Sequence, residues 1–431
     1  MGKEVFADKL TSGDFSMMLE VTLPADEESL RRQLDALADR DAWSGIVLSC
    51  RTAGASAGAI VPALQLLRAM APELPAILVM SGRGWSDVEV MNFARGVPSG
   101  GQYAVMAVSG DLQAATPRPA HLDSVIALDL LRHAAPELLC GAAVTPAQYD
   151  HLDSTLIYGK MEKKIAAGAR FLVMSALWDM KKAQELQWYL RLHDYAVPAF
   201  AEAEYFSPEV LDYYIHGEVH RSLVAGAMLR QLRGALKESP EAFRDCQMDR
   251  LARQVIGYRL LGFSGMVMRG LDTPQLRLAF LNALEAASRH LHDYNRWLES
   301  WRQDECCQAL PPLQSTDYLY RDLLEPDCQY EDNDEMRGTP PWHGQPPKPG
   351  LGDRLKSSVR RILDRQGVPA ALKHLAGLNE DTVEKLRKTA YLDNDGCPKA
   401  LVCGACGGLQ PGGRCEDNTR QCFFRRTLGL E

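Results

Sequence analysis

The residues with the clearest chemical potential lie near the C-terminus, where five cysteines are interleaved with glycine and proline. They are Cys397, Cys403, Cys406, Cys415 and Cys422. Glycine and proline bend the backbone sharply, so several thiolates can converge on one point, and four of them suffice for a tetrahedral zinc site. The alternatives are a redox pair and a disulfide cluster. We favour zinc because nothing else in the chain suggests an oxidising compartment.

Two carboxylates in the N-terminal part of the chain suit acid–base chemistry. Glu20 stands inside an apolar run, where a carboxylate is costly unless it keeps its proton or gains a partner, so it can serve as a general acid. Asp111 directly follows another apolar run. The alternatives are a Glu20 that points to water from a frayed strand end and an Asp111 that caps a helix. We expect Asp179 to be a helix cap.

Eight short apolar runs, with longer amphipathic stretches between them, must position these residues. The runs cover residues 17–22, 45–49, 76–80, 103–110, 138–144, 169–176, 197–203 and 263–269. Helices are expected at 26–40, 57–70, 153–167, 181–195 and 240–261. Nearly continuous apolar runs between helices are typical of parallel strands buried on both faces.

This pattern predicts an α/β fold, a (β/α)8 TIM barrel over about residues 15–298, with Glu20 and Asp111 facing one cavity at the C-terminal ends of the strands. The alternative is an open doubly wound sheet, but the chain lacks its Gly-x-Gly-x-x-Gly turn after the first run.

The composition of the chain limits the classes of partner and the compartment that we expect for it. Apolar residues make up 46% of the chain, enough for a sizeable core, and the net charge of -8 with no long basic run argues against nucleic acid. No apolar run approaches the roughly 18 residues of a membrane span, and the first residues form no apolar signal region. We therefore expect a cytoplasmic protein, with its other cysteines reduced.

A stretch rich in proline and acidic residues, 311–350, divides the chain. It predicts a linker that runs in extended form between a barrel domain, 1–310, and a C-terminal module, 351–431. Residues 351–392 are expected to be helical, with a basic face that docks on the barrel or a partner. We also expect an oligomer or a subunit of a complex.

Several short motifs match a known family in order and spacing. They are Leu19-Glu20-Val-Thr-Leu-Pro24, Gly110-Asp111, Gly141-Ala-Ala-Val-Thr-Pro146, Lys163-Lys164 ahead of Gly168-Ala169, and the cysteine signature Cys397-Pro-Lys, Gly404-Ala-Cys406-Gly-Gly, Gly413-Arg-Cys415-Glu and Cys422. On these residues the chain resembles the methylenetetrahydrofolate reductase family, in the form with a cysteine-rich C-terminal module. The resemblance covers about residues 15–288 and 351–424, and the cysteine signature is its most specific part.

The resemblance implies a flavoenzyme that interconverts methylenetetrahydrofolate and methyltetrahydrofolate in one-carbon metabolism. FAD would lie across the strand ends, with NAD(P)H, ferredoxin or a partner flavoprotein as the electron donor. Glu20 would be the acid that opens the folate ring, and Asp111 would lie near flavin and folate.

The resemblance also implies sets of ligand-binding residues. Those matched to the cofactor are Ser49, Ser109, Gly110, Asp111, Thr145, Lys163 and Lys164, with the two lysines at its phosphates. Those matched to the substrate are Glu20, Ser175 and Phe206. The zinc ligands would be Cys397, Cys406, Cys415 and Cys422, with Cys403 either a free thiol or a replacement for one of them.

The chain departs from the family at residues that usually contact flavin and pterin. Met174-Ser175 stands where the family often has Thr-Gln, whose Gln holds the pterin. Ser109 stands where the family often has an Arg or a Thr, and Thr145 stands where it has a Tyr. Residues 77–84 hold no counterpart of the family's flavin-facing His. Two other interpretations therefore stay open: a flavin-free, folate-dependent methyl transferase, and a non-catalytic subunit that keeps the barrel and the zinc module.

Overall fold

The computed structural model describes most of the chain up to residue 303 and several shorter stretches after it. The described residues are 14–23, 27–35, 42–49, 60–72, 74–98, 102–112, 121–215, 224–303, 318–320, 336–337, 396–410, 412–416 and 420–428. The helices expected over 351–392 and most of the expected linker, 311–350, lie outside these residues.

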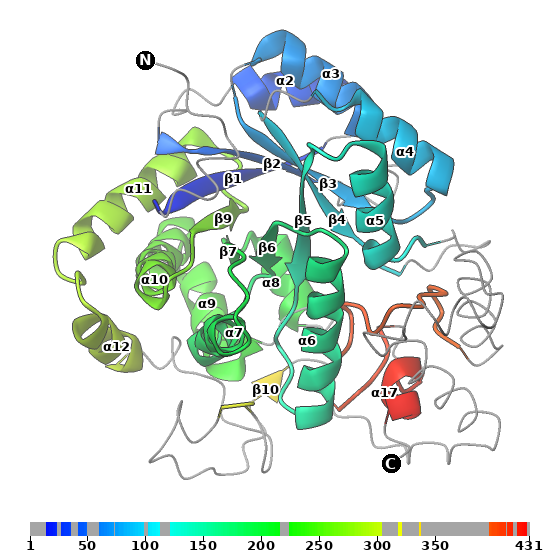
Figure 1. The fold of residues 1–431 in the computed structure, drawn as a ribbon. Helices are drawn as coiled ribbons and strands as arrows, with labels where there is room; N and C mark the ends of the chain where they lie inside the picture. The colour runs from blue at the N-terminus through cyan, green and yellow to red at the C-terminus, as the bar shows by residue number, and fades with distance from the viewer. Residues whose placement is uncertain are drawn as a thin grey trace, which may run out of the picture.

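Eight parallel strands close into a barrel, which confirms the predicted (β/α)8 fold (Figure 1). The strands are β1 (Ser16–Thr22), β2 (Gly45–Ser49), β3 (Ala76–Ser81), β4 (Tyr103–Val108), β5 (Leu139–Val144), β6 (Phe171–Met174), β7 (Ala199–Glu204) and β9 (Gly265–Arg269). They pair in this order, and β9 closes the ring by pairing with β1. Each apolar run of the sequence coincides with one strand to within two residues at either end, because side chains on both faces of a parallel barrel are buried.

The inside of the barrel forms a core of its own. Its buried members are Met18, Val47, Ile77, Ala104, Met106, Leu139, Phe171, Val173, Phe200 and Val267. The rings of Phe171 and Phe200 meet edge to face, with their centroids 6.2 Å apart. Gly141 makes room for this pair, since a Cβ there would lie 2.3 Å from the Phe171 ring. Because side chains fill the barrel, a ligand site has to form at the strand ends.

Helices surround the barrel and follow the strands in turn (Figure 1). Those that follow the first five strands, one after each, are α2 (Glu27–Asp35), α3 (Ile60–Met70), α4 (Asp87–Gly96), α5 (Ser124–Ala134) and α6 (His151–Ala166). Those of the second half are α7 (Met180–Leu192), α8 (Pro208–Ile215), α9 (Gly226–Glu238), α10 (Pro240–Leu261), α11 (Pro274–Ser288) and α12 (Tyr294–Gln303).

Caps fix where several of these helices begin. Asp179 is the N-cap of α7 and accepts a hydrogen bond from the Lys181 amide at 2.9 Å, as the sequence predicts. Asp123 caps α5 in the same way, through the Val125 amide at 3.0 Å. Helix α10 starts at a proline and ends at Gly262, whose φ of 89° suits a residue without a side chain.

The described pieces that follow α12 lie against the barrel domain. The Tyr318 hydroxyl donates to the Asp179 carboxylate at 2.7 Å. A short strand, β10 (Met336–Arg337), pairs with β8 (Val224–Ala225) in antiparallel fashion. The described parts of the expected linker, 318–320 and 336–337, are therefore in contact with the barrel domain.

The cysteine-rich segment lies beside α6 and ends in a short helix, α17 (Phe423–Leu428), which packs against α6 (Figure 1, orange to red). Leu401, Leu409 and Phe424 from this segment join the main apolar core. The cysteines that the structure describes form no disulfides. Within the described ranges, no helix is long and apolar enough to cross a membrane.

Candidate functional site at the barrel mouth

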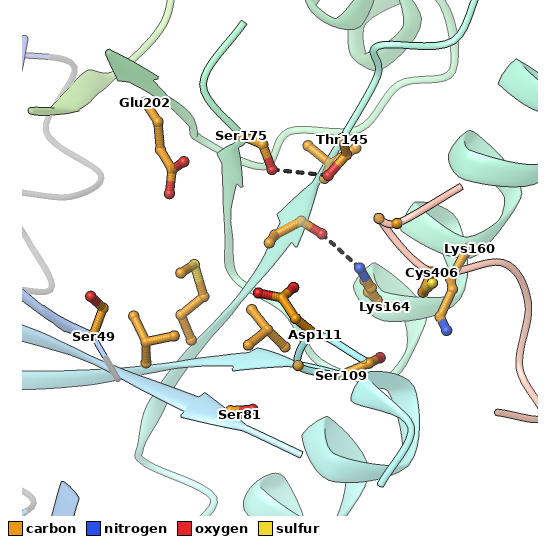
Figure 2. A pocket seen from close by; sticks show the side chains of 18 of the residues that line it. Ser49, Ser81, Ser109, Asp111, Thr145, Lys160, Lys164, Ser175, Glu202 and Cys406 are labelled. Carbon is orange, nitrogen blue, oxygen red and sulfur yellow. Dashed lines mark hydrogen bonds between the residues drawn. The ribbon is translucent and has the colours of Figure 1, made fainter. Parts of the chain in front are cut away.

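A cavity of about 180 Å³ lies at the C-terminal ends of the barrel strands (Figure 2). Its polar lining residues are Glu20, Ser49, Ser81, Arg83, Ser109, Asp111, Thr145, Lys160, Lys164, Ser175, Glu202, Lys399 and Cys406. Glu20 and Asp111 face this one cavity, as the sequence predicts. Figure 2 shows Ser49 and Glu202 on one side of it and Lys160, Lys164 and Cys406 on the other.

Glu20 points inward from β1 and is held there by two neighbours. The Ser49 hydroxyl, at the end of β2, donates to Glu20 Oε1 at 2.7 Å. The Arg269 Nε lies 3.3 Å from Glu20 Oε2. The Glu20 side chain is only 7% exposed, so the alternative of a frayed strand end that points to water does not apply.

Arg269, the last residue of β9, gathers two further carboxylates. Its guanidinium lies 2.6 Å from Glu202 Oε2 and 3.2 Å from Glu204 Oε1, both on β7. The Ala176 amide also donates to Glu202, at 3.1 Å. One guanidinium thus faces three carboxylates, which makes this side of the cavity acidic. This cluster was not predicted from the sequence, although two acids inside the Ala-Phe-Ala-Glu-Ala-Glu strand were a visible signal.

The loop after β4 carries Ser109, Gly110 and Asp111. Gly110 has a φ of 78°, and a Cβ there would lie 2.3 Å from the Ser81 hydroxyl, so the tight turn that leads to Asp111 requires glycine. Among the described residues, the next helix is α5, and its cap is Asp123 and not Asp111.

Three lysines of α6 point toward the other side of the cavity or its rim. Lys160 donates to the buried Asp123 carboxylate at 3.1 Å. Lys164 donates to the Ala143 carbonyl at 2.6 Å, and burial together with the nearby Lys160 lowers its pKa to about 7. Lys163 donates to the Cys403 carbonyl at 3.2 Å and does not line the cavity. The two lysines predicted to bind the cofactor therefore have different surroundings. Lys164 lines the cavity, and Lys163 binds the C-terminal segment.

The predicted substrate residues also separate. Ser175 lines the cavity, and its hydroxyl lies 2.9 Å from the Thr145 hydroxyl. Phe206 is fully buried in the core instead, with its ring 5.0 Å from the Trp178 ring and 4.6 Å from the Tyr214 ring, measured between centroids. The structure therefore brings Ser175, and not Phe206, to the site.

The C-terminal segment supplies part of the cavity wall. Lys399 donates to the Gly110 carbonyl at 2.6 Å and forms an ion pair with Glu416. The Leu112 amide donates to Glu416 at 2.7 Å. Two buried, charged side chains from the C-terminal segment are thereby bound to the loop that carries Asp111. Docking on the barrel or a partner was expected only for residues 351–392, and these contacts of Lys399 and Glu416 were not predicted from the sequence.

The predicted zinc ligands are buried or half-buried in the same segment. Burial, together with Cys406, raises the pKa of the Cys397 thiol to about 11. Burial, together with Cys406 and Cys397, raises that of Cys422 to about 12. These three thiols are therefore close enough to influence one another. Among the residues that the structure describes, however, no group of three or more Cys, His, Asp or Glu side chains is arranged to hold a metal ion. The zinc site stays a prediction.

Two of the residues that the resemblance matches to FAD contact the C-terminal segment in this structure. The Gly110 carbonyl accepts a hydrogen bond from Lys399, and the Lys163 ammonium donates to the Cys403 carbonyl. The binding of FAD stays a prediction.

Comparison with protein-family models and with curated proteins gives no match. Among solved structures, an uncharacterized protein from Clostridium thermocellum that binds two copies of 5-methyl-5,6,7,8-tetrahydrofolic acid is similar over 66% of this chain and 99% of its own, with 14% identity and a TM-score of 0.47. A 2,3-dimethylmalate lyase of the PEP mutase/isocitrate lyase superfamily is similar over 70% of this chain and 89% of its own, with 12% identity and a TM-score of 0.37.

An oxaloacetate acetylhydrolase is similar over 69% of this chain and 94% of its own, with 10% identity and a TM-score of 0.38. Values this low leave the chemistry of this chain to be argued from its own residues.

Proposed function

We propose that this chain binds a reduced folate at the mouth of its barrel and acts on the one-carbon group that the folate carries. The observation that carries the proposal is the meeting of Glu20 and Asp111 at one cavity. These are the two carboxylates to which the family resemblance assigns folate chemistry. They come from strands far apart in the sequence, β1 and β4, and only barrel closure brings them together.

Glu20 is placed to move a proton at a folate nitrogen. Breaking the bond between that nitrogen and the one-carbon group is easier when the nitrogen is protonated, so a positioned acid accelerates the step. The hydrogen bond from Ser49 and the ion pair with Arg269 fix the direction of the Glu20 carboxyl group. Glu20 takes up a proton before the step and returns to the ion pair as a carboxylate after giving it up.

Glu202 suits the other end of the folate head group. The aminopyrimidinone ring of a pterin presents adjacent N–H donors, and a carboxylate accepts two such donors side by side. Glu202 lines the cavity and is oriented by Arg269 and by the Ala176 amide. Glu202 lies on β7, the strand next to β6 in the barrel. Ser175, directly after β6, stands where the family has its pterin-binding Gln.

We favour a reaction without bound flavin. Two residues that the resemblance matches to FAD, Gly110 and Lys163, bind the C-terminal segment, and several residues that usually contact flavin in the family are replaced in this chain. Transfer of a methyl group between folate and an acceptor uses the same proton at the folate nitrogen and needs no hydride donor. The family's electron donors, NAD(P)H, ferredoxin or a flavoprotein, have no role in that reaction.

Two measurements on the purified full chain test this proposal. Calorimetric titration with 5-methyltetrahydrofolate should give one binding site per cavity, and Glu202→Gln should weaken binding by about tenfold or more, the loss expected for a charge-assisted hydrogen bond. Glu285→Gln, at an exposed ion pair on α11, is the matched control and should bind like the parent. A protein that does not bind 5-methyltetrahydrofolate refutes the proposal. A purified protein that is yellow, has a flavin absorbance spectrum and binds folate would instead support the reductase activity.

A further inference from the structure

The acidic and the basic side chains of the cavity stand on opposite sides of it. Glu202 lies on one side together with Ser49, the partner of Glu20. Lys160 and Lys164 lie on the other side (Figure 2). Under the proposed function, the folate nitrogen that loses the methyl group faces Glu20. A methyl acceptor has to approach the methyl carbon from the side opposite that nitrogen, because the new bond forms as the carbon–nitrogen bond breaks. The acceptor therefore has its place on the lysine side.

Three lysines are among the described residues that line the cavity, and two of them are held by carboxylates. Lys160 is 3% exposed and donates to the Asp123 carboxylate and to the Gly404 carbonyl, each at 3.1 Å. Lys399 forms the buried ion pair with Glu416. An ammonium ion that is paired in this way keeps its protons, because the carboxylate beside it would otherwise be left buried without a counter-charge. Neither lysine is suited to accept a proton.

Lys164 differs from them because its hydrogen-bond partner is a neutral carbonyl group. Its Nζ donates to the Ala143 carbonyl of β5 at 2.6 Å, and its side chain lines the cavity. Burial and, to a smaller extent, repulsion from Lys160 lower the pKa of Lys164 to about 7, while Asp123 and Cys406 oppose this shift only in part. A desolvated amine next to another cation is the setting in which lysines act as bases or nucleophiles. The other charged side chains that line the cavity are Glu20, Arg83, Asp111, Lys160, Glu202 and Lys399.

We infer that Lys164 is the general base that takes a proton from the methyl acceptor, and that this acceptor is a thiol. The inference rests on the proposed function and names the acceptor for it. The thiol gives its proton to Lys164 Nζ, and the sulfur electron pair forms the bond to the methyl carbon. The electron pair of the broken carbon–nitrogen bond returns to the folate nitrogen, which takes a proton from Glu20. The products are a methyl thioether and the demethylated folate, and the proton gained by Lys164 balances the one that Glu20 gave up.

Proton affinities decide the class of the acceptor. A thiol has a pKa of about 8.5, so an amine with a pKa of about 7 takes its proton against a ratio of only about thirtyfold. An ammonium group, with a pKa of about 10.4, yields its proton to the same base against a ratio of more than about a thousandfold. A hydroxyl group holds its proton about as tightly as water does, with a pKa of about 15.7. Among these three classes, Lys164 can therefore activate a thiol.

Three acceptors of one shape separate these classes, because 2-mercaptoethanol, ethanolamine and ethylene glycol differ only in their SH, NH2 or OH group. The purified full chain receives 5-methyltetrahydrofolate with a carbon-13 label in its methyl group, and mass spectrometry identifies the methylated product. We expect the label in the methyl thioether of 2-mercaptoethanol. Transfer to ethanolamine or ethylene glycol at a comparable rate overturns the inference.

Variants of Lys164 separate a base from a structural role. Lys164→Ala should slow the transfer by roughly 10²–10⁴-fold, and added ethylamine should restore part of the rate by accepting the proton in place of the missing amine. The rate of the parent should rise with pH through about pH 7, because the neutral amine is the active form, whereas the rate of the variant should follow the ionisation of the free thiol. Lys237→Ala, at an exposed position of α9, is the matched control and should react like the parent. Equal rates in the parent and Lys164→Ala, or a variant that ethylamine does not rescue, overturn the role of Lys164.

Calorimetric titration with 5-methyltetrahydrofolate on each chain separates this inference from the proposed function. Folate binding by Lys164→Ala shows that its cavity is intact. A parent chain that binds folate and methylates no thiol refutes this inference alone. A parent chain that binds no folate refutes the proposed function and this inference with it.

Discussion

Asp123→Asn should be among the most damaging single changes outside the cavity, because one buried carboxylate accepts from four donors. Asp123 is 2% exposed, caps α5 through the Val125 amide, pairs with Lys160 at 3.1 Å and accepts the Val402 and Cys403 amides of the C-terminal segment. Burial raises the pKa of Asp123, but Lys160 and the amide donors outweigh burial and hold the pKa below its ordinary value. The carboxylate is therefore the form that the fold requires.

The magnitude follows from the charge that the substitution leaves behind. Removing one partner of a buried ion pair costs about 3–5 kcal/mol, because Lys160 would stay buried without its counter-charge. The control is Asp129→Asn on the same helix, where the pair with Arg132 is exposed on both sides and is worth about 0–1 kcal/mol. Urea unfolding gives both values, and hydrogen exchange at Val402 and Cys403 should accelerate only in the Asp123 variant.

The pH dependence checks the same reasoning. A carboxyl group whose pKa is lowered by folding stabilises the protein above its unfolded pKa, about 3.9, and this stability is lost as the pH falls through the folded pKa. The difference between the parent and Asp123→Asn should therefore be full near pH 7 and shrink below about pH 4. A cost below about 1 kcal/mol at pH 7, with the Val402 and Cys403 amides still protected from exchange, would refute the central role of this carboxylate.

Three further predictions concern the cavity and the cysteines. Glu20→Gln keeps the shape and removes the exchangeable proton, so folate binding should persist while turnover falls by roughly 10²–10⁴-fold; unchanged turnover rules the acid role out. Lys164→Met should stabilise the protein below pH 7 by up to about 5 kcal/mol. The pKa of Lys164 is lowered from 10.5 to about 7, so its buried ammonium destabilises the parent most below pH 7, and the stability of the parent rises between pH 7 and pH 10.5. Equal stability of the two chains at pH 6 contradicts this. Metal analysis should find about one zinc per chain, lost in Cys415→Ser and kept in Cys403→Ser, whereas a metal-free chain with an ordered cysteine segment would speak against the site.

The barrel was predictable because its signal is local and repeated. Parallel strands buried on both faces must be apolar throughout, so each strand stands out as a run, such as Ala-Ile-Leu-Val-Met at 76–80. The meeting of Glu20 and Asp111 followed from that prediction, since parallel strands present their C-terminal ends on one side. The helix over 240–261 was predicted to the residue, because a proline begins it and a glycine follows it.

What the sequence could not show depends on contacts between distant segments. Arg269 finds its partners on β1 and β7, and only barrel closure brings these strands to it. Lys399 reads as part of a cysteine motif, and its contact with Gly110 requires the C-terminal segment to reach the barrel mouth. Phe206 follows a strand end, as a ligand residue would, but Trp178 and Tyr214 enclose it in the core.

The most direct test of the central claim is a crystal structure of the full chain with 5-methyltetrahydrofolate. We expect the pterin ring in the cavity, with its N–H donors on Glu202, its methyl-bearing nitrogen toward Glu20, and Lys399 at the cavity wall. A folate bound elsewhere on the barrel, or a flavin in this cavity, would contradict the proposed function.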